Sequence, residues 1–393
     1  MSAPRPTPSP HEAAVRLHWA MRIEGAVNRL VRPPLGRLGW RPKIVPYVGY
    51  GSSRATTGDP SRPVSAAKAT VRVLARVLLA PPGTTRRDLE RGRGWRRFLA
   101  ITAPSVPVTI EAGGQTTVIE SAYGGYIDAV LETDLTPGWT QVRLTCAGGA
   151  PAEVPVRVVA ADERLGVITD IDDTIIVTTL PRPLVAFWNT FVKREFARRP
   201  VPGIAEMLKA AVSGHPQALV VYVSTGAWNV APAIDAFLVR HGLPRGPMLL
   251  TDWGPAPDRW FRSGTEHKRA QLNRLMHDLP QLQWLLVGDD GQHDPQLYTE
   301  LASNHPGRIR AVAIRELTAA EQLLSHGTPE PIDEQSEPPK RSKAPVEVRG
   351  ADGHALLAAL RHRQVIRGQL REPSRQLGVR RVEGTATDTT GHT

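Results

Sequence analysis

The pattern of hydrophobic positions changes several times along this chain of 393 residues. Between His11 and Arg32 apolar residues recur every three or four positions, which predicts an amphipathic helix with arginines on its polar side. Pro33-Pro34 would end it, so residues 1–41 are predicted to be a basic N-terminal helical segment. Such a helix can lie on a membrane surface or pack against the next domain. We favour packing, because most amphipathic stripes are packing faces.

Residues 42–162 change to a period of two, which predicts β-strands. Two alternating segments, Val108 to Glu111 and Thr117 to Glu120, flank Gly113-Gly114, an arrangement typical of a β-hairpin. Further strands are predicted at Tyr126 to Glu132, Val142 to Cys146 and Val154 to Val159. Several short strands with glycine and proline turns favour a small β-sandwich domain. It holds no group of candidate catalytic residues, so we interpret it as a binding or scaffolding domain.

Residues 163–325 alternate apolar runs with helical stretches, which is typical of an α/β fold with helices on both faces of a parallel sheet. The predicted strands are Gly166 to Thr169, Ala218 to Val223, Trp284 to Val287 and Ile309 to Ile314. In such doubly wound sheets, ligands bind outside the carboxyl ends of the strands. The polar, proline-rich residues 326–393 are predicted to form a disordered basic tail, in which Ala355 to Leu370 could form a short helix.

Composition constrains the partners and the compartment. The formal net charge of +11 favours an anionic surface, but it does not distinguish nucleic acid from acidic lipid. The single cysteine, Cys146, excludes an intramolecular disulfide, so the fold does not depend on an oxidising compartment. The chain has no apolar run of roughly 18 residues, and its N-terminus lacks the apolar core of a signal peptide. We therefore expect a cytoplasmic protein with at most peripheral contact at the inner face of the membrane.

Candidate chemistry begins in the run Asp170-Ile171-Asp172-Asp173-Thr174, which follows a predicted strand. Residues two apart in an extended segment point the same way, so Asp170 and Asp172 can reach one pocket. Two carboxylates so close repel each other, and a cation is expected to hold them together. Carboxylate and water oxygens are ligands that suit Mg²⁺. Taken alone, the run is also compatible with an Asx-turn or a helix cap.

Three further features each follow a predicted strand or open a helix. Ser224, in a Ser-Thr-Gly run, can hold a phosphate oxygen or cap the following helix. Lys268 can neutralise phosphoryl oxygens, although a lone lysine on a helix is usually solvated. Asp289 and Asp290, with Asp294 nearby, can complete a metal site or simply form an acidic loop.

In combination, an acid pair, a hydroxyl, a lysine and a second acid pair in this order resemble the four motifs of the haloacid dehalogenase superfamily of phosphotransferases. The surrounding residues resemble more narrowly the catalytic domain of the phosphatidate phosphatases typified by the yeast actin-patch protein. The segments that carry this resemblance are Gly166 to Ile175, Tyr222 to Asn229, Leu250 to Pro255 and His267-Lys268. One departure is Ala227, where the family often has a proline before the tryptophan.

This resemblance implies a haloacid-dehalogenase-like fold, a doubly wound parallel sheet without a large cap domain. It also implies that Asp170 is the nucleophile, forming an aspartyl-phosphate, and that Asp172 is the general acid and base. Ser224 and Lys268 would hold the phosphoryl oxygens. By the same resemblance, Mg²⁺ would be bound by oxygen atoms of Asp170, the Asp172 carbonyl and Asp289. Asp290 or Asp294 would lie in the outer shell of the ion.

The short gaps between the motifs bear on the substrate. They leave no room for a full cap domain, and an open site suits a bilayer lipid or a polymer. The leading hypothesis is therefore hydrolysis of phosphatidate to diacylglycerol, with peripheral contact to anionic lipid. The tryptophans expected near the rim of such a site, where they could contact lipid or pack in the core, are Trp188, Trp228, Trp253 and Trp260. Two alternatives stay open: a phosphatase of nucleic-acid terminal phosphates, and a non-catalytic lipid-binding adaptor.

Overall fold

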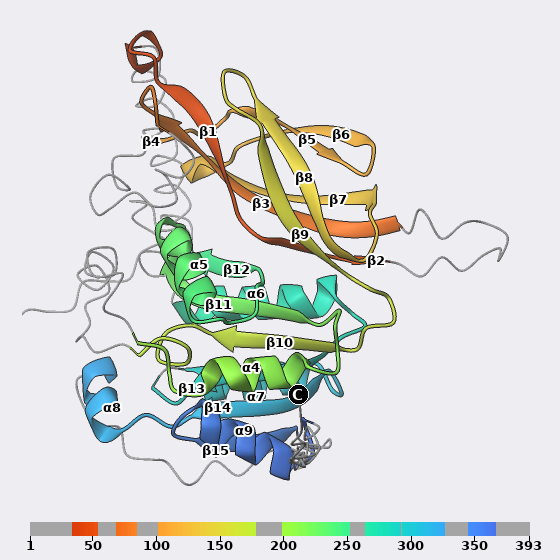
Figure 1. The fold of residues 1–393 in the computed structure, drawn as a ribbon, viewed down its shortest axis with the longest axis vertical. Coiled ribbons are helices and arrows are strands. Elements are labelled where there is room, and N and C mark those ends of the chain that lie inside the picture. The colour runs from red at the N-terminus through yellow and green to blue at the C-terminus, as the bar shows by residue number, and fades with distance from the viewer. Residues whose placement is uncertain are drawn as a thin grey trace, which may run out of the picture.

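A computed structural model describes two regions that follow one another along the chain and pack side by side (Figure 1). The described residues are 34–53, 68–84, 101–177, 199–251, 264–291, 293–326 and 345–366. The predicted N-terminal helix lies outside them. No helix within these ranges is long and apolar enough to cross a membrane.

The first region consists of nine described strands that hydrogen bonds join into one branched sheet. The strands are β1 (Arg41–Pro46), β2 (Gly49–Ser53), β3 (Lys68–Ala80), β4 (Ile101–Thr102), β5 (Pro107–Ala112), β6 (Gln115–Glu120), β7 (Tyr126–Asp134), β8 (Gly138–Cys146) and β9 (Ala152–Val159), with the 3-10 helix η2 (Tyr123–Gly125) before β7. Their order is β1-β3-β2-β9-β8-β5-β6, and β4 and β7 pair with β3. Because these strands form one sheet, the two separate sheets of a sandwich are not confirmed.

Two predictions about local structure in this region have clear outcomes. The hairpin is confirmed, since β5 and β6 pair antiparallel across Gly113 and Gly114, both of which have positive φ. In β3, Val71 and Val73 point into the core of the sheet, as the period of two predicts. The alternate residue Arg72 is also buried, because that face of β3 is turned toward the second region.

The second region is a six-stranded sheet in which all neighbouring strands are parallel. Its elements are β10 (Leu165–Asp170), α4 (Ile204–Val212), β11 (Leu219–Ala227), η3 (Trp228–Val230), α5 (Ala231–Arg240), β12 (Met248–Thr251), α6 (Gly264–Asp278), β13 (Gln283–Asp289), α7 (Asp294–Asn304), β14 (Ile309–Arg315), α8 (Ala319–His326), β15 (Val346–Gly350) and α9 (Gly353–His362). The order is β12-β11-β10-β13-β14-β15. Helices α4 and α9 contact each other, as do α6 and α7, and the two pairs lie on opposite faces of the sheet (Figure 1). The predicted parallel α/β sheet is thus confirmed.

The C-terminal part of the chain departs from the prediction of a disordered tail. β15 adds to the edge of the sheet by pairing with β14, with Val346 opposite Ala311. The following helix, α9, is capped by Asp352, whose carboxylate accepts a hydrogen bond from the backbone of Ala355. Its Leu356 is fully buried in the core of the second region. The prediction is therefore wrong for residues 345–366, because β15 depends on pairing with a distant strand.

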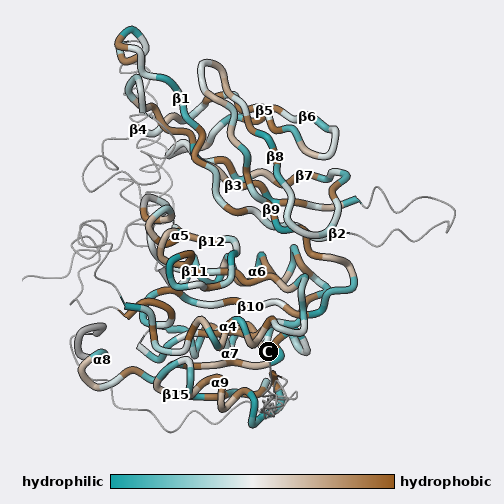
Figure 2. Tube along the Cα trace, viewed as in Figure 1, coloured by the Kyte–Doolittle hydropathy of each residue, from teal (hydrophilic) through white to brown (hydrophobic). Residues whose placement is uncertain are grey.

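The two regions share a hydrophobic core. Tyr47, Tyr50 and Leu74 of the first region belong to the same buried cluster as the strands of the second. A separate cluster fills the interior of the branched sheet. Hydrophobic positions recur along the strands of both regions (Figure 2). The first region is therefore packed against the α/β region through apolar contacts, which places it close to the helices that cover the parallel sheet.

Candidate active site

The main predicted site residues meet at one edge of the parallel sheet. β10 ends at Asp170, which pairs with Val223 of β11, the residue before Ser224. On its other side β10 pairs with β13, which ends at Asp289. Parallel strands end at the same edge of a sheet, so Asp170, Ser224 and Asp289 come together there. All three are buried.

A tight turn follows the first of these strands. The backbone N–H groups of Ile175 and Ile176 both donate to the carbonyl of Ile171. Asp173 has a φ of 59°, the left-handed conformation that few residues other than glycine adopt. The guanidinium of Arg315, at the end of β14, donates to the Asp173 carbonyl at 2.6 Å. This buried contact holds the turn in its strained conformation.

The turn gives the two predicted catalytic carboxylates different partners. Lys268 Nζ, on α6, lies 2.6 Å from Asp170 Oδ1. Ser224 Oγ donates to Asp172 Oδ2 at 2.9 Å, and the backbone N–H of Gly226 donates to the same Ser224 oxygen at 2.9 Å. Burial raises the pKa of Asp170, and the charge of Asp172 raises it further. The two acids are thus close enough to interact, yet each contacts a different side chain, Lys268 for Asp170 and Ser224 for Asp172.

Three carboxylates and one ammonium form the buried centre of the site. One oxygen from each of Asp170, Asp289 and Asp294 lies within 4.8 Å of the others. Lys268 Nζ donates to Asp294 Oδ1 at 2.8 Å. Burial raises the pKa of Asp170 and of Asp289 well above the usual range of a carboxyl, and Asp294 adds to both shifts while Lys268 opposes them. Burial alone would lower the pKa of Lys268, but the surrounding carboxylates outweigh it and raise that pKa.

A divalent cation fits this centre. Asp170 Oδ2 and Asp294 Oδ2 are buried and have no hydrogen-bond partner within the described part of the chain. Three carboxylates against one ammonium leave negative charge, and a buried site does not retain uncompensated charge. Donors that are all oxygen suit Mg²⁺ or Ca²⁺. A Cβ at position 288 would lie 2.7 Å from Asp294 Oδ2, so Gly288 is what allows this carboxylate to reach the centre.

The acidic residues at and after the end of β13 point in different directions. Asp289 points into the centre, where Thr174 Oγ1 donates to its Oδ2 at 3.2 Å and the backbone of Gly291 donates to its Oδ1 at 2.9 Å. Asp290 does not belong to the carboxylate group. Its Oδ1 accepts a hydrogen bond from the backbone N–H of Leu317 at 2.9 Å. Of the two predicted alternatives, the structure therefore places Asp294, and not Asp290, beside Asp170 and Asp289.

Of the four tryptophans predicted near the rim of the site, the structure describes Trp228, and it does not support a rim position for this residue. Trp228 follows the Ser224 segment and is 8% exposed. Its ring stacks on the ring of Tyr47 from the first region, with the two centroids 4.4 Å apart. The centroid of the Tyr126 ring, also from the first region, lies 6.4 Å away. Trp228 is thus a packing residue between the two regions. The other rim tryptophans, Trp188, Trp253 and Trp260, lie outside the described residues.

Comparison with known proteins identifies the segment that holds the site. Residues 165–316 match the family model described as phosphatidate phosphatase APP1, catalytic domain. Phosphatidate phosphatase APP1 of Saccharomyces cerevisiae is 24% identical over 233 residues, which cover 56% of this chain and 39% of the relative. An uncharacterized protein of Schizosaccharomyces pombe is 25% identical over 167 residues, which cover 42% of this chain and 27% of the relative. The chain thus matches less than half the length of either relative.

The similarity of this chain to solved structures is weak. A carbohydrate acetylesterase from Xanthomonas citri matches over 75% of this chain and 71% of its own, with 11% identity and a TM-score of 0.23. That similarity is too low to support an inference about fold or function. The family match, in contrast, spans β10 to β14 and includes every residue of the carboxylate centre. The α/β segment of this chain, residues 165–316, is thus similar to the phosphatidate phosphatase APP1 catalytic domain.

Proposed function

We propose that this protein is a magnesium-dependent phosphatase that hydrolyses phosphatidate to diacylglycerol through an aspartyl-phosphate. The observation that carries the proposal is the buried cluster in which Lys268 lies between Asp170 and Asp294. The cluster stands within a segment that matches a phosphatidate phosphatase catalytic-domain family. A hydroxyl and a second acid, at Ser224 and Asp172, lie at the same edge of the sheet.

Asp170 is the proposed nucleophile. Its carboxylate attacks phosphorus, the bond from phosphorus to the glycerol oxygen breaks, and an aspartyl-phosphate forms. Asp170 Oδ2 is free of hydrogen bonds to the described residues, so this oxygen is available for attack. Lys268 contacts the other oxygen and, by opposing the effect of burial, favours the ionised carboxylate that attack requires.

Asp172 is the proposed acid and base. It gives a proton to the departing alkoxide and then accepts one from the water that attacks the aspartyl-phosphate, which releases inorganic phosphate and restores Asp170. Ser224 Oγ donates to Asp172 Oδ2, while Asp172 Oδ1 is buried without a hydrogen-bond partner among the described residues. One oxygen is therefore fixed and the other is available to carry the proton. Ser224 and Lys268 supply donors to the phosphoryl oxygens.

Asp170, Asp289 and Asp294 are the residues that would hold Mg²⁺. The family resemblance adds the Asp172 carbonyl as a further oxygen ligand. When bound, the ion would supply positive charge that offsets the repulsion between the nucleophile and the phosphoryl oxygens. The hydrogen bond from Thr174 to Asp289 keeps that carboxylate turned toward the centre.

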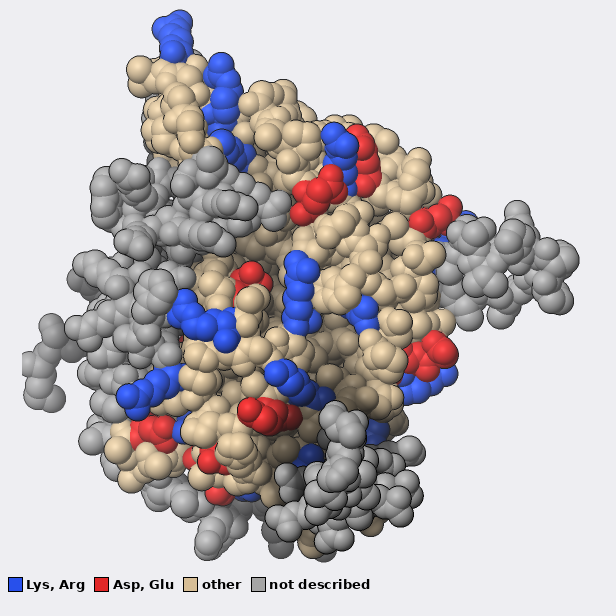
Figure 3. All heavy atoms as spheres, in the orientation of Figure 1, with Lys and Arg blue, Asp and Glu red and all other residues tan. Residues whose placement is uncertain are grey.

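Similarity to a named phosphatidate phosphatase supports phosphatidate as the substrate. The Saccharomyces cerevisiae relative is itself named a phosphatidate phosphatase. Phosphatidate resides in bilayers, and a formal net charge of +11 is compatible with contact with an anionic lipid surface, as it is with nucleic acid. On the face shown in Figure 3, lysines and arginines stand in small groups mixed with acidic residues and form no continuous basic stripe. The described residues on this face therefore give no specific support for a nucleic-acid substrate.

One assay with a matched variant tests the proposal. The purified full chain is given phosphatidate in detergent micelles with Mg²⁺, then with EDTA, and released phosphate is measured. Asp170→Asn keeps the shape of the nucleophile and removes its charge, so we expect a loss of about 10³-fold or more. Asp290→Asn, on the neighbouring loop, should release phosphate at the parent rate. Equal release by Asp170→Asn would refute the catalytic assignment. Release from phosphorylated oligonucleotides, but not from phosphatidate, would favour the nucleic-acid alternative.

A further inference from the structure

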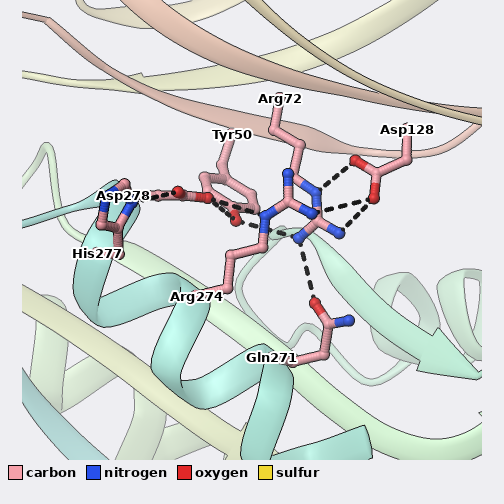
Figure 4. Close-up of polar contacts among 7 residues, drawn as sticks. All are labelled: Tyr50, Arg72, Asp128, Gln271, Arg274, His277 and Asp278. Carbon is pink, nitrogen blue, oxygen red and sulfur yellow. Dashed lines mark hydrogen bonds and ion pairs between the residues drawn. The ribbon is translucent and has the colours of Figure 1, made fainter.

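A polar network joins the first region to α6, the helix that carries the candidate lysine (Figure 4). Arg72 of β3 donates to both carboxylate oxygens of Asp128 on β7, at 2.7 and 2.8 Å. It also donates to the hydroxyl of Tyr50 at 3.1 Å and to Gln271 Oε1 at 3.2 Å. The Tyr50 hydroxyl in turn donates to Asp278 Oδ2 at 2.7 Å. The network thus holds α6 both in its middle and at its end.

The chemistry of this network suits it to fixing an orientation. Arg72 is only 5% exposed, and Tyr50 is 1% exposed. A buried charged group adds little net stability, because its desolvation offsets most of what its pairing contributes. A guanidinium nevertheless makes directional bonds in a rigid fork, which apolar contacts cannot replace. Apolar packing alone would allow α6 to slide or rotate on the first region, whereas bonds to Gln271 and Asp278 fix its position along and around its axis.

The network acts close to the chemistry. Gln271 stands three residues after Lys268 on α6, so the two side chains leave adjacent turns of one helix. On the other flank, Arg269 forms an ion pair with Glu300 of α7, the helix that begins at Asp294. The helix is therefore held between the first region and α7. A displacement of α6 would move the ammonium of its lysine away from carboxylates that now lie within 3 Å of it.

The first region also contacts the segment that follows Ser224. Tyr47 of the first region stacks on Trp228, four residues after Ser224. Tyr126 lies on the same tryptophan, and Arg76 of β3 covers the Tyr126 ring at 4.6 Å from its centroid. The first region therefore contacts both the segment that supplies the candidate hydroxyl and the helix that supplies the candidate lysine.

We propose that the β-rich first region is a structural part of the catalytic apparatus, in which Arg72 is a positioning residue that holds α6 so that Lys268 stays between Asp170 and Asp294. The catalytic consequence rests on the function proposed above. The positional consequence does not, because it concerns where the lysine lies. This differs from the interpretation of the first region as a separate binding module.

The position of Lys268 is measured first, without reference to activity. The full chain is treated with an acylating reagent for amines, and the rate at which Lys268 is modified is followed by mass spectrometry against the exposed Lys209. Because Lys268 is 5% exposed, it should react slowly in the parent chain. In Arg72→Met its rate relative to Lys209 should rise severalfold. The matched control is Arg143→Met, which replaces an exposed and weakly paired arginine of the same region. It should leave the modification rate of Lys268 unchanged.

A milder variant keeps the inference testable if Arg72→Met does not fold. Tyr50→Phe keeps the buried ring and removes only the hydroxyl that contacts Arg72 and Asp278. It should raise the modification rate of Lys268 in the same direction by a smaller factor. If neither variant changes that rate, the inference is overturned, whether or not the chain is a phosphatase.

Kinetics then test whether the position matters for catalysis. Arg72→Met should lower kcat by about tenfold or more with little change in KM, because the lysine acts on charge that develops in the transition state. In a Lys268→Met background, Arg72→Met should cause no further loss. If the two losses multiply, Arg72 does not act through Lys268 and the inference is overturned. If the parent chain releases no phosphate from any monoester, the proposed function fails, and the modification rates alone decide the inference.

Discussion

Replacing Lys268 with Met tests the electrostatic balance of the site most directly. The substitution keeps the length of an unbranched side chain and removes the ammonium that lies 2.6 Å from Asp170 and 2.8 Å from Asp294. Three carboxylates, each at most 1% exposed, would then share the centre without a counter-charge. Breaking a buried ion pair by removing one partner costs roughly 3–5 kcal/mol.

Part of that cost will be relieved by protonation. Burial already raises the pKa of Asp170 and of Asp289, and loss of the lysine removes the charge that opposes this shift, so these acids will take up protons more readily. We therefore expect Lys268→Met to lower the free energy of unfolding by about 3 kcal/mol at neutral pH without divalent cations. Phosphatase activity should fall by about 10²-fold or more, as expected when one preorganised donor is removed.

Urea unfolding followed by circular dichroism measures the first effect, and phosphate release measures the second. Unfolding is repeated at saturating Mg²⁺, which should reduce the loss of stability because the cation replaces part of the missing charge. Lys209→Met, in an exposed residue of α4, is the control and should change neither quantity. A loss below about 1 kcal/mol that is the same with and without Mg²⁺ would refute this account of the centre.

Three more predictions follow from single contacts. Asp294→Asn should raise the Mg²⁺ concentration for half-maximal activity by about tenfold or more, whereas Asp290→Asn should leave it unchanged. Arg315→Met frees the strained turn after the acid pair and should lower kcat by about tenfold, while Arg310→Met, on the exposed side of the same strand, should not. Burial lowers the pKa of His267 to about 4 from 6.5, so the unfolded chain binds its proton first as pH falls. The free energy of unfolding should therefore decrease between pH 6.5 and 4, by up to about 3 kcal/mol, and urea titrations of His267→Gln should lack that part.

Much of the site can be predicted from the sequence because the sheet is parallel. Apolar runs mark the strands, and in a parallel sheet the residues that follow each strand meet at one edge. Asp170, Ser224 and Asp289 were placed together by this rule, and the structure brings them together. The rule fails for Asp290 and Asp294. Which of them reaches the centre depends on the turn after β13 and on the absence of a Cβ at position 288, and neither follows from strand periodicity.

The C-terminal strand shows a different limit of sequence analysis. Val346–Gly350 follows a long polar, proline-rich stretch, and five residues are too few for periodicity to distinguish a strand from a loop. The segment is ordered by pairing with β14 and by the leucines of α9, which are buried against the sheet. Arg315 connects this addition to the site, since it donates to the Ala351 carbonyl at 3.1 Å as well as to the turn after Asp170.

Strand periodicity alone also led to the interpretation of the first region as a separate module. Arg72 and Arg76 alternate with valines along β3, and a period of two is the same whether the polar face meets solvent or another domain. Only the structure shows that both arginines are buried, Arg72 against α6 and Arg76 against the ring of Tyr126. If the proposed function holds, the chemistry at the sheet edge is supported from two sides by parts of the chain outside the matched catalytic segment. Substitutions in those parts should then lower the turnover rate while every motif residue is intact.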